Sequence, residues 1–163
     1  MSQKGSTTRR TTRGTPKDVA FKAATRLHRA VFRLSRGRLF GRALGMPVVE
    51  LITTGRTSGK ERTTMLTAPV LEEDRVVLIA SFGGDDRDPA WLLNLRAHPT
   101  VRLTAAGRTR TMIARVLSGD ERDALWSEVS SAFPVYANYQ KRTERTIPVV
   151  VLTPADRSAS RAT

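Results

Sequence analysis

The chain of 163 residues contains no cysteine, only two histidines, and no apolar run approaching the roughly 20 residues that cross a bilayer. Without cysteine it cannot form disulfides, use a thiol nucleophile or bind a metal through thiolates. His28 and His98 lie far apart, without carboxylates at ligand spacing, so we expect no metal site. A nucleophile elbow, a Ser/His/Asp set and a GxGxxG motif are also missing. If the chain is an enzyme, we expect a bound organic cofactor to carry the chemistry.

Acidic residues are scarce at the start of the chain. Residues 1–45 hold 12 of the 28 Lys and Arg but only one of the 15 acids, Asp18, so the remainder is nearly neutral. The net charge of +13 therefore says little about the chemistry of the core. The composition predicts a disordered basic tail over residues 1–16 and a flexible tail over 155–163. No apolar segment resembles a secretory signal, so we expect a cytoplasmic protein.

Residues 17–45 combine a helical pattern with a glycine-containing linker. Between Lys17 and Arg36 the apolar side chains fall within about 120° of helix surface, and the cations within about 80° on the opposite side. This basic amphipathic helix suits an anionic membrane surface, so we expect peripheral association with the membrane. A helix packed on the domain with a solvated basic face fits the same pattern. Nucleic acid is a weaker alternative, because the region has no groove-reading or base-stacking motif.

Residues 46–154 show short apolar strands separated by turns. We expect strands over 48–54, 62–71, 75–81, 101–105, 109–117 and 146–152. One short helix is predicted to begin with Asp88 as its N-cap and Pro89 as its first residue. A second helix is predicted from a capping box formed by Ser118 and Glu121. About six antiparallel strands, closed to protect their edges, predict a mostly β protein built as a small barrel.

The first candidate site is the turn after the first strand, Gly55-Arg56-Thr57-Ser58-Gly59-Lys60-Glu61-Arg62. Arg56, Lys60 and Arg62 supply three positive charges, and Ser58 supplies a hydroxyl. The two glycines allow backbone amides to approach a ligand, so the segment suits a phosphate or a carboxylate. The alternative is a solvated basic turn without a ligand.

The second candidate is Ser81-Phe82-Gly83-Gly84, which follows an apolar strand and precedes a helix that carries Trp91 and Asn94. A strand end, a bare backbone and a helix start together suit a large anionic cofactor. An ordinary strand end beside a core helix explains the same residues equally well.

The third candidate holds the two tyrosines of the chain, Tyr136 and Tyr139. Their spacing places them on one face of a helical turn. Two phenol rings can stack on a flat ligand and donate hydrogen bonds to it, or they can line the rim of a core.

The first two candidates belong to a set of four motifs that occur in order along the chain. They are Thr53-Thr54-Gly55-Arg56-x-Ser58-Gly59-x-x-Arg62, Ser81-x-Gly83-Gly84, Pro89-x-Trp91-x-x-Asn94-Leu95-x-x-x-Pro99 and Arg145-x-Ile147-Pro148-Val149-Val150-Val151-Leu152-x-Pro154. Over residues 46–154 they resemble the deazaflavin-dependent nitroreductase family, the coenzyme F420-dependent quinone reductases of actinobacteria.

The resemblance implies a split β-barrel related to flavin-binding barrels. It also implies that reduced coenzyme F420 binds and transfers a hydride from its C5 atom to a quinone, a nitroaromatic or an activated enone. By the same resemblance, Arg56, Ser58 and Arg62 hold the phosphate and acidic tail of the cofactor, with Lys60 as a local addition.

The resemblance further implies where the remaining candidates act. It places Ser81–Gly84 beside the deazaflavin and the acceptor, and Trp91 and Asn94 on the helix that supports the pocket. It places Tyr136 and Tyr139 on the acceptor side. We expect the hydroxyls of Tyr136, Tyr139 and Ser81 to stabilise negative charge that develops on the acceptor.

Two positions depart from the family pattern. Phe82 stands where a lysine is common, so we expect one phosphate contact to be lost and replaced by Lys60. Phe133 stands where a tyrosine often occurs, which disfavours nitroimidazoles more than flat apolar acceptors. A non-catalytic barrel, or one that binds FMN or haem, is the alternative from the residues alone.

Overall fold

The computed structural model describes residues 42–156, so the predictions for residues 1–16, for most of 17–45 and for 157–163 lie outside the described residues. No helix within the described range is long and apolar enough to cross a membrane. In chain order the elements are β1 (Arg42–Ala43), β2 (Met46–Thr54), β3 (Glu61–Thr67), β4 (Val70–Leu71), β5 (Val76–Ile79), the 3-10 turn η1 (Phe82–Gly84), α2 (Ala90–Ala97), β6 (Thr100–Ala105), β7 (Arg108–Val116), α3 (Gly119–Ala132), α4 (Pro134–Gln140) and β8 (Val149–Pro154).

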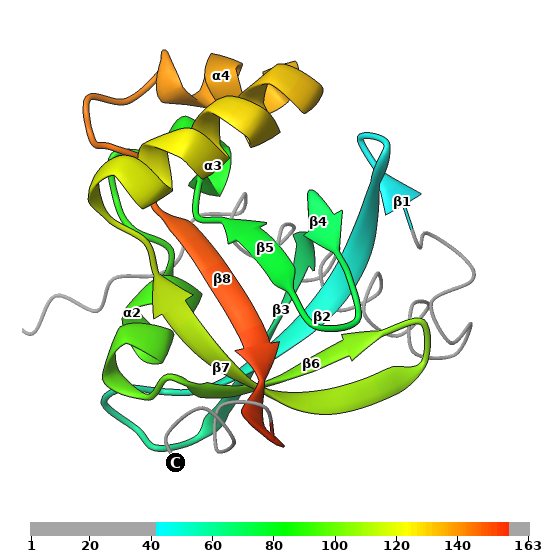
Figure 1. Ribbon diagram of the computed structural model, residues 1–163. Helices are drawn as coiled ribbons and strands as arrows, with labels where there is room; N and C mark the ends of the chain where they lie inside the picture. The colour runs from blue at the N-terminus through cyan, green and yellow to red at the C-terminus, as the bar shows by residue number, and fades with distance from the viewer. Residues whose placement is uncertain (1–41, 157–163) are drawn as a thin grey trace, which may run out of the picture.

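The strands form one antiparallel sheet that curls around a core (Figure 1). Its order is β3-β2-β6-β7-β8-β5-β4, and β1 also pairs with β2. The mostly β fold of a split barrel with helices is therefore confirmed. The sheet has eight strands instead of about six, because β1 and β4 are short additional strands of two residues each.

The two edges of the sheet, β3 and β4, are consecutive in the chain. We predicted a single strand over 62–71, and this was wrong, because the chain leaves β2 after Thr67 and pairs with β5 from Val70. At the break the N–H of Ala68 donates to the carbonyl of Pro47 at 2.9 Å, and Pro69 has no N–H to donate. The predicted closure was therefore wrong: β3 and β4 do not pair with each other, and the sheet is not closed into a barrel.

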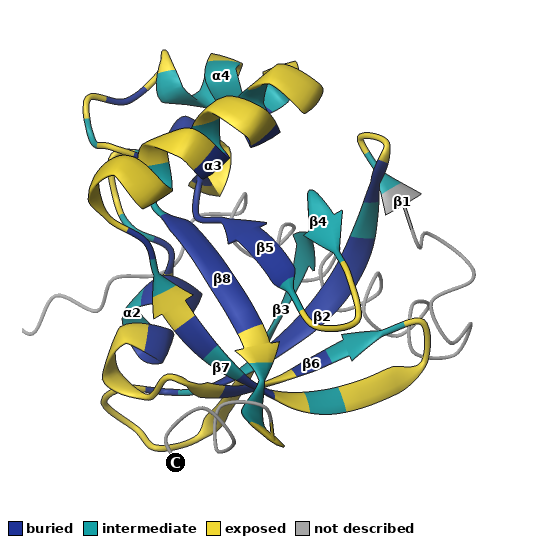
Figure 2. Cartoon of the chain, in the orientation of Figure 1, coloured by how far each residue is buried: buried dark blue, intermediate teal, exposed yellow. Residues whose placement is uncertain are grey.

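β5 and residues 149–152 of β8 are buried on both faces and are dark blue in Figure 2. Alternate residues point to opposite sides of a strand, so Leu78 and Val150 enter the core inside the curled sheet, where α2 also packs. Ile79 and Val149 enter a second core, under α3 and α4. This double burial explains why β5 and residues 149–152 of β8 are apolar at every position instead of alternating.

Both predicted capping arrangements were wrong, although the helices themselves are present. Pro89 is the N-cap of α2, and the Asp88 carboxylate binds the guanidinium groups of Arg96 and Arg145 instead of the helix end. Ser118 is the N-cap of α3 without a side-chain bond, because Glu121 pairs with Arg115. In each case the carboxylate instead binds a guanidinium, which offers a positive charge and more than one N–H donor.

Candidate active site

The turn between β2 and β3 is closed by its own backbone. The N–H of Gly55 donates to the Lys60 carbonyl at 2.8 Å, and the N–H of Gly59 donates to the Gly55 carbonyl at 2.8 Å. A Cβ atom at Gly55 would lie 2.7 Å from the Ser58 hydroxyl oxygen and 3.0 Å from the Lys60 carbonyl oxygen. Only glycine therefore allows the Ser58 hydroxyl to fold back to this position.

Asn94 of α2 ties the turn to the helix. Its side-chain oxygen accepts from the backbone N–H of Arg56 at 3.1 Å, and its side-chain nitrogen donates to Thr53 Oγ1 at 3.1 Å. Thr53 Oγ1 donates in turn to the Arg62 carbonyl at 3.4 Å. Asn94 and Thr53 are both buried, so this amide fixes both arms of the hairpin against α2.

Between the hairpin and α2 lies an open groove of about 590 Å³. It brings together five of the predicted cofactor-binding residues, namely Arg56, Ser58, Arg62, Trp91 and Asn94. Arg62 Nη2 lies 3.4 Å from Ser58 Oγ. Arg56 and Arg62 are both exposed residues. The one acid in the lining, Glu61, is paired with Arg102, so two cations face the groove without competition from that carboxylate.

Lys60 takes a different part in the hairpin. It does not line the groove; its carbonyl closes the turn, and its N–H lies 3.3 Å from Ser58 Oγ. The cations that the structure places beside Phe82 are Arg87, over its ring, and Arg142, near Gly83. Compensation by Lys60 for the residue at position 82 therefore stays a prediction.

Ser81–Gly84 forms a second cluster, against the C-terminal end of α4. The N–H of Gly84 donates to the Ser81 carbonyl at 2.9 Å, and Phe82 and Gly83 both have positive φ angles, of 48° and 70°. A Cβ atom at Gly84 would lie only 2.7 Å from the Tyr139 carbonyl oxygen. The glycine pair is thus required both by the turn geometry and by close contact with α4.

Tyr136 and Tyr139 do share one face of α4, with ring centroids 6.4 Å apart in an edge-to-face arrangement. They differ in exposure, because Tyr136 is only 3% exposed whereas Tyr139 is half-buried. The Tyr136 hydroxyl lies 3.0 Å from Thr67 Oγ1 and 3.4 Å from the sulfur of Met46, and burial raises its pKa. Its hydroxyl is therefore held inside the second core.

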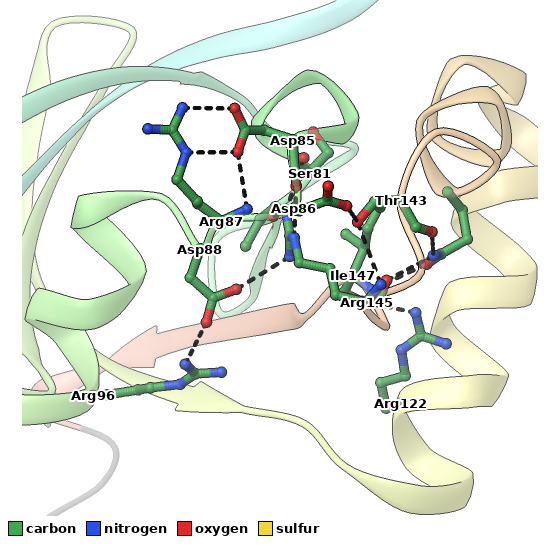
Figure 3. A network of polar contacts seen from close by, with 12 residues as sticks. Ser81, Asp85, Asp86, Arg87, Asp88, Arg96, Arg122, Thr143, Arg145 and Ile147 are labelled. Carbon is green, nitrogen blue, oxygen red and sulfur yellow. Dashed lines mark hydrogen bonds and ion pairs between the residues drawn. The ribbon is translucent and has the colours of Figure 1, made fainter.

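Arg145 is the functional candidate that sequence reasoning missed, although it opens the fourth motif. Figure 3 shows its guanidinium at the centre of the loop that follows β5. It donates to the carbonyls of Ala80, Ser81 and Asp85 at 2.9, 3.0 and 2.8 Å, and to the Asp88 carboxylate at 3.2 Å. One side chain thus holds both sides of the Ser81–Gly84 turn.

Neighbouring side chains fix the same loop. Thr143 Oγ1 donates to the Asp86 carboxylate at 2.7 Å, and the Arg87 guanidinium holds the pKa of Asp85 well below its usual range. The Gln140 side chain donates to the Arg145 carbonyl at 2.8 Å, which positions the Arg145 backbone. The conformation of the loop from β5 to α2 is therefore fixed by contact with α4 and by hydrogen bonds to the segment after it.

The predicted residues thus fall into two clusters. The groove holds Arg56 and Arg62, while Ser81–Gly84 lies with Tyr139 at α4, and neither Ser81–Gly84 nor the tyrosines line the groove. The segment 85–89 joins the clusters, because Asp88 pairs with both Arg145 and Arg96 of α2. In residues 42–156 no group of three or more acidic or histidine side chains could hold a metal ion.

Comparison with known proteins identifies the family. The model of the F420H(2)-dependent quinone reductases matches residues 24–154. The chain belongs to this family. An F420H(2)-dependent quinone reductase of Mycobacterium tuberculosis is 39% identical over 132 residues, which are 78% of this chain and 88% of the relative.

Two solved structures are similar to this chain, and one of them is named as a reductase that depends on F420-H2. That of an F420-H2 dependent reductase shares 39% identity with a TM-score of 0.58, covering 65% of this chain and 93% of that chain. A domain-swapped dimer shares 34% identity with a TM-score of 0.60, covering 85% of this chain and 99% of that chain. The resemblance seen in the four motifs is therefore confirmed.

Coenzyme F420 is the cofactor that the quinone reductase family implies, and the groove fits it. A phosphate and an acidic tail require cations and N–H or O–H donors, which Arg56, Arg62 and Ser58 supply together. The Ser58 hydroxyl lies so close to Gly55 that residue 55 can carry no side chain on this wall of the groove. The donor set is therefore that of an anion-binding site.

Proposed function

We propose that the protein binds reduced coenzyme F420 and uses it to reduce a quinone, with nitroaromatics and activated enones as further acceptors. The observation that carries the proposal is the cationic groove, which the family motif builds from the β2–β3 hairpin and α2. When bound, the cofactor supplies the hydride. The protein must bind its anionic part, orient the acceptor and limit access of water.

On the cofactor side, Arg56 and Arg62 bind the anionic groups and the Ser58 hydroxyl adds a hydrogen bond. Asn94 holds the N–H of Arg56 and thereby fixes the start of the turn before the cofactor arrives. Trp91 of α2 is buried in the core inside the curled sheet and also lines the groove, so it supports the groove wall. Because these groups are positioned before the cofactor binds, little conformational entropy is lost on binding.

On the acceptor side, we propose that the hydroxyls of Ser81 and Tyr139 stabilise the negative charge that hydride transfer leaves on an acceptor oxygen. Ser81 follows the buried strand β5, and its backbone is held by Arg145. Tyr136 was predicted to have the same role, which stays a prediction. The bonds of its hydroxyl to Thr67 and Met46 support a part in positioning α4 and hence Tyr139.

The test is a fluorescence titration of the full chain with F420 beside a titration with FMN, followed by an assay of F420H2 oxidation with a quinone. We expect tight binding of F420, weak binding of FMN, and one quinone reduced for each F420H2 oxidised. Preference for FMN would replace this proposal by an FMN-binding barrel. Binding of F420 without oxidation by any quinone would leave a non-catalytic cofactor-binding protein.

We also propose that the enzyme associates with anionic membranes through residues 17–45, which would bring it to lipid quinones. The support is the basic amphipathic pattern of the sequence, with 12 Lys and Arg in residues 1–45. Co-sedimentation with phosphatidylglycerol vesicles should remove the wild type from solution, and a variant with Gln at Lys22, Arg26, Arg29, Arg33 and Arg36 should remain. Equal sedimentation of the two proteins would refute this location.

A further inference from the structure

The backbone of Phe82 has a conformation that the fold does not otherwise demand of a large residue. Within residues 42–156 three non-glycine residues have positive φ, namely Leu44, Phe82 and Ala106. Leu44 and Ala106 each precede a glycine in the two-residue loop of a β-hairpin, where the favoured turn requires positive φ at both positions. Phe82 lies in the connection between strand β5 and helix α2, which is not a β-hairpin, so no hairpin turn requires its positive φ.

The surroundings hold the turn in this conformation. The Arg145 guanidinium binds the carbonyls of Ala80 and Ser81 before Phe82 and the carbonyl of Asp85 after it. Gly84 lies directly against the backbone of α4. A large side chain adopts the left-handed region at a cost in conformational energy, which Gly or Asn would largely avoid. Backbone strain at Phe82 that its neighbours hold in place points to a function for the Phe82 side chain.

Burial does not explain the presence of the aromatic ring. Phe82 is 50% exposed, and it is one of two large apolar residues of the described chain with high exposure. The Arg87 guanidinium lies 5.9 Å from the centre of its ring. Phe82 therefore contributes little to the cores, and its ring is presented at the surface.

Against the next two residues of the same turn, Gly83 and Gly84, α4 and the residues after it present a second aromatic group with a cation. The Arg142 guanidinium lies 5.4 Å over the Tyr139 ring and 3.5 Å from the Gly83 carbonyl oxygen. Arg87 is bound to the Asp85 carboxylate through two bonds of 2.8 Å. Arg142 has no carboxylate partner among residues 42–156, so its charge is available to an oxygen atom of a ligand.

We propose that Phe82 is a specificity-determining residue, and that with Tyr139 and Arg142 it forms the docking surface for a planar acceptor with carbonyl oxygens, such as a naphthoquinone. This rests on the proposed function. The exposed ring offers a face for stacking, and the guanidinium offers a charge for a quinone oxygen. The pinned turn keeps the ring at the surface, where a flexible loop would let it fold back.

Phe82→Asn tests the strain and the docking role separately. Asn tolerates the left-handed region, so we expect a melting temperature equal to that of the wild type or about 3 °C higher. The matched control is Leu44→Asn, which replaces another exposed apolar residue with positive φ, far from η1 in the sequence. A melting temperature of Phe82→Asn several degrees below the wild type would show that the ring is structural and would overturn the proposal.

The kinetic arm uses 1,4-naphthoquinone and F420H2. We expect Phe82→Asn to raise the KM for the naphthoquinone about five-fold with an unchanged Kd for F420, and Phe82→Tyr to keep the wild-type KM. Leu44→Asn should leave both constants unchanged. An unaltered quinone KM in Phe82→Asn would refute the docking surface while wild-type turnover still supports the proposed function. A wild type that reduces no quinone would refute both.

Discussion

The backbone N–H of Arg56 donates to the side-chain oxygen of Asn94, 3.1 Å away and 38 residues further along the chain. The other end of the same amide donates to Thr53. Asn94 therefore joins the two walls of the groove, and it does so with a group that both donates and accepts. An aspartate of the same shape could accept from Arg56 but could not donate to Thr53.

We expect Asn94→Ala to reduce the free energy of unfolding by about 2 kcal/mol, because it removes two hydrogen bonds of a buried amide, to the Arg56 N–H and to the buried Thr53 hydroxyl. The loosened turn should also weaken F420 binding several-fold. Urea unfolding and fluorescence titration measure the two effects, with Asn138→Ala, an exposed position of α4, as the control. Lower stability with an unchanged Kd for F420 would show that the turn does not depend on Asn94 for binding.

Arg62→Ala should weaken F420 binding about tenfold, the loss expected for one charge-assisted bond to an anion. The dependence of the Kd on salt concentration should become shallower, because one cation has been removed from the groove. Arg108→Ala removes an exposed cation from the β6–β7 hairpin and should change neither quantity. Wild-type titrations in Arg62→Ala would contradict the assignment of the groove.

Tyr136→Phe should reveal the buried phenol in the pH dependence of stability. Burial raises the pKa of Tyr136, so the neutral form favours the folded state, and this contribution is lost as pH rises above the ordinary tyrosine value of about 10. The wild type should therefore lose stability as pH rises above about 10, and the variant less so. At neutral pH the variant should be about 1 kcal/mol less stable, since the bond to Thr67 is gone.

The same variant separates two roles of Tyr136 in the enzyme. We expect turnover to fall more than F420 affinity, because α4 carries Tyr139, which we propose to lie on the acceptor side. Stopped-flow reduction of a quinone and cofactor titration give the two quantities. Kinetics identical to those of the wild type would exclude Tyr136 from catalysis, whether direct or through α4.

Gly83→Ala and Gly84→Ala form a matched pair at neighbouring positions. Both glycines have positive φ, of 70° and 85°, so each alanine should cost about 1 kcal/mol of stability. At Gly83 the added Cβ meets nothing within 4 Å, whereas at Gly84 it lies 2.7 Å from the Tyr139 carbonyl oxygen. We therefore expect Gly84→Ala to cost about 1–3 kcal/mol more in urea unfolding, and equal losses would refute the contact with α4.

The fold could be predicted from sequence wherever a local pattern decides it. The β6–β7 hairpin and the doubly buried β8 follow from turn residues and apolar runs. The division of 62–71 into β3 and β4 could not, because an apolar run does not show which strand it pairs with. Pro69 was the one local signal for the break, since it cannot donate to a ladder.

The site residues could likewise be predicted only where a local sequence pattern marks them. The cationic turn and the helix with Asn94 were predicted together, and the structure brings them together. Arg145 was not predicted as a site residue, because it binds backbone carbonyls more than 60 residues earlier. Every residue has a carbonyl, so the sequence does not show which carbonyls a distant side chain binds. Asp88 was misassigned as a cap for a similar reason, as its distant partner Arg145 was not visible from local sequence.

The position of β8 between β5 and β7 has a consequence for synthesis of the protein. Val149–Pro154 leaves the ribosome after every other strand, yet it completes the ladders on both sides of it. Until then the nascent chain can form the β2–β3 and β6–β7 hairpins, while β5 and β7 each carry an unpaired edge. Premature termination before Val149 would therefore release a chain with two open edges, a template for aggregation.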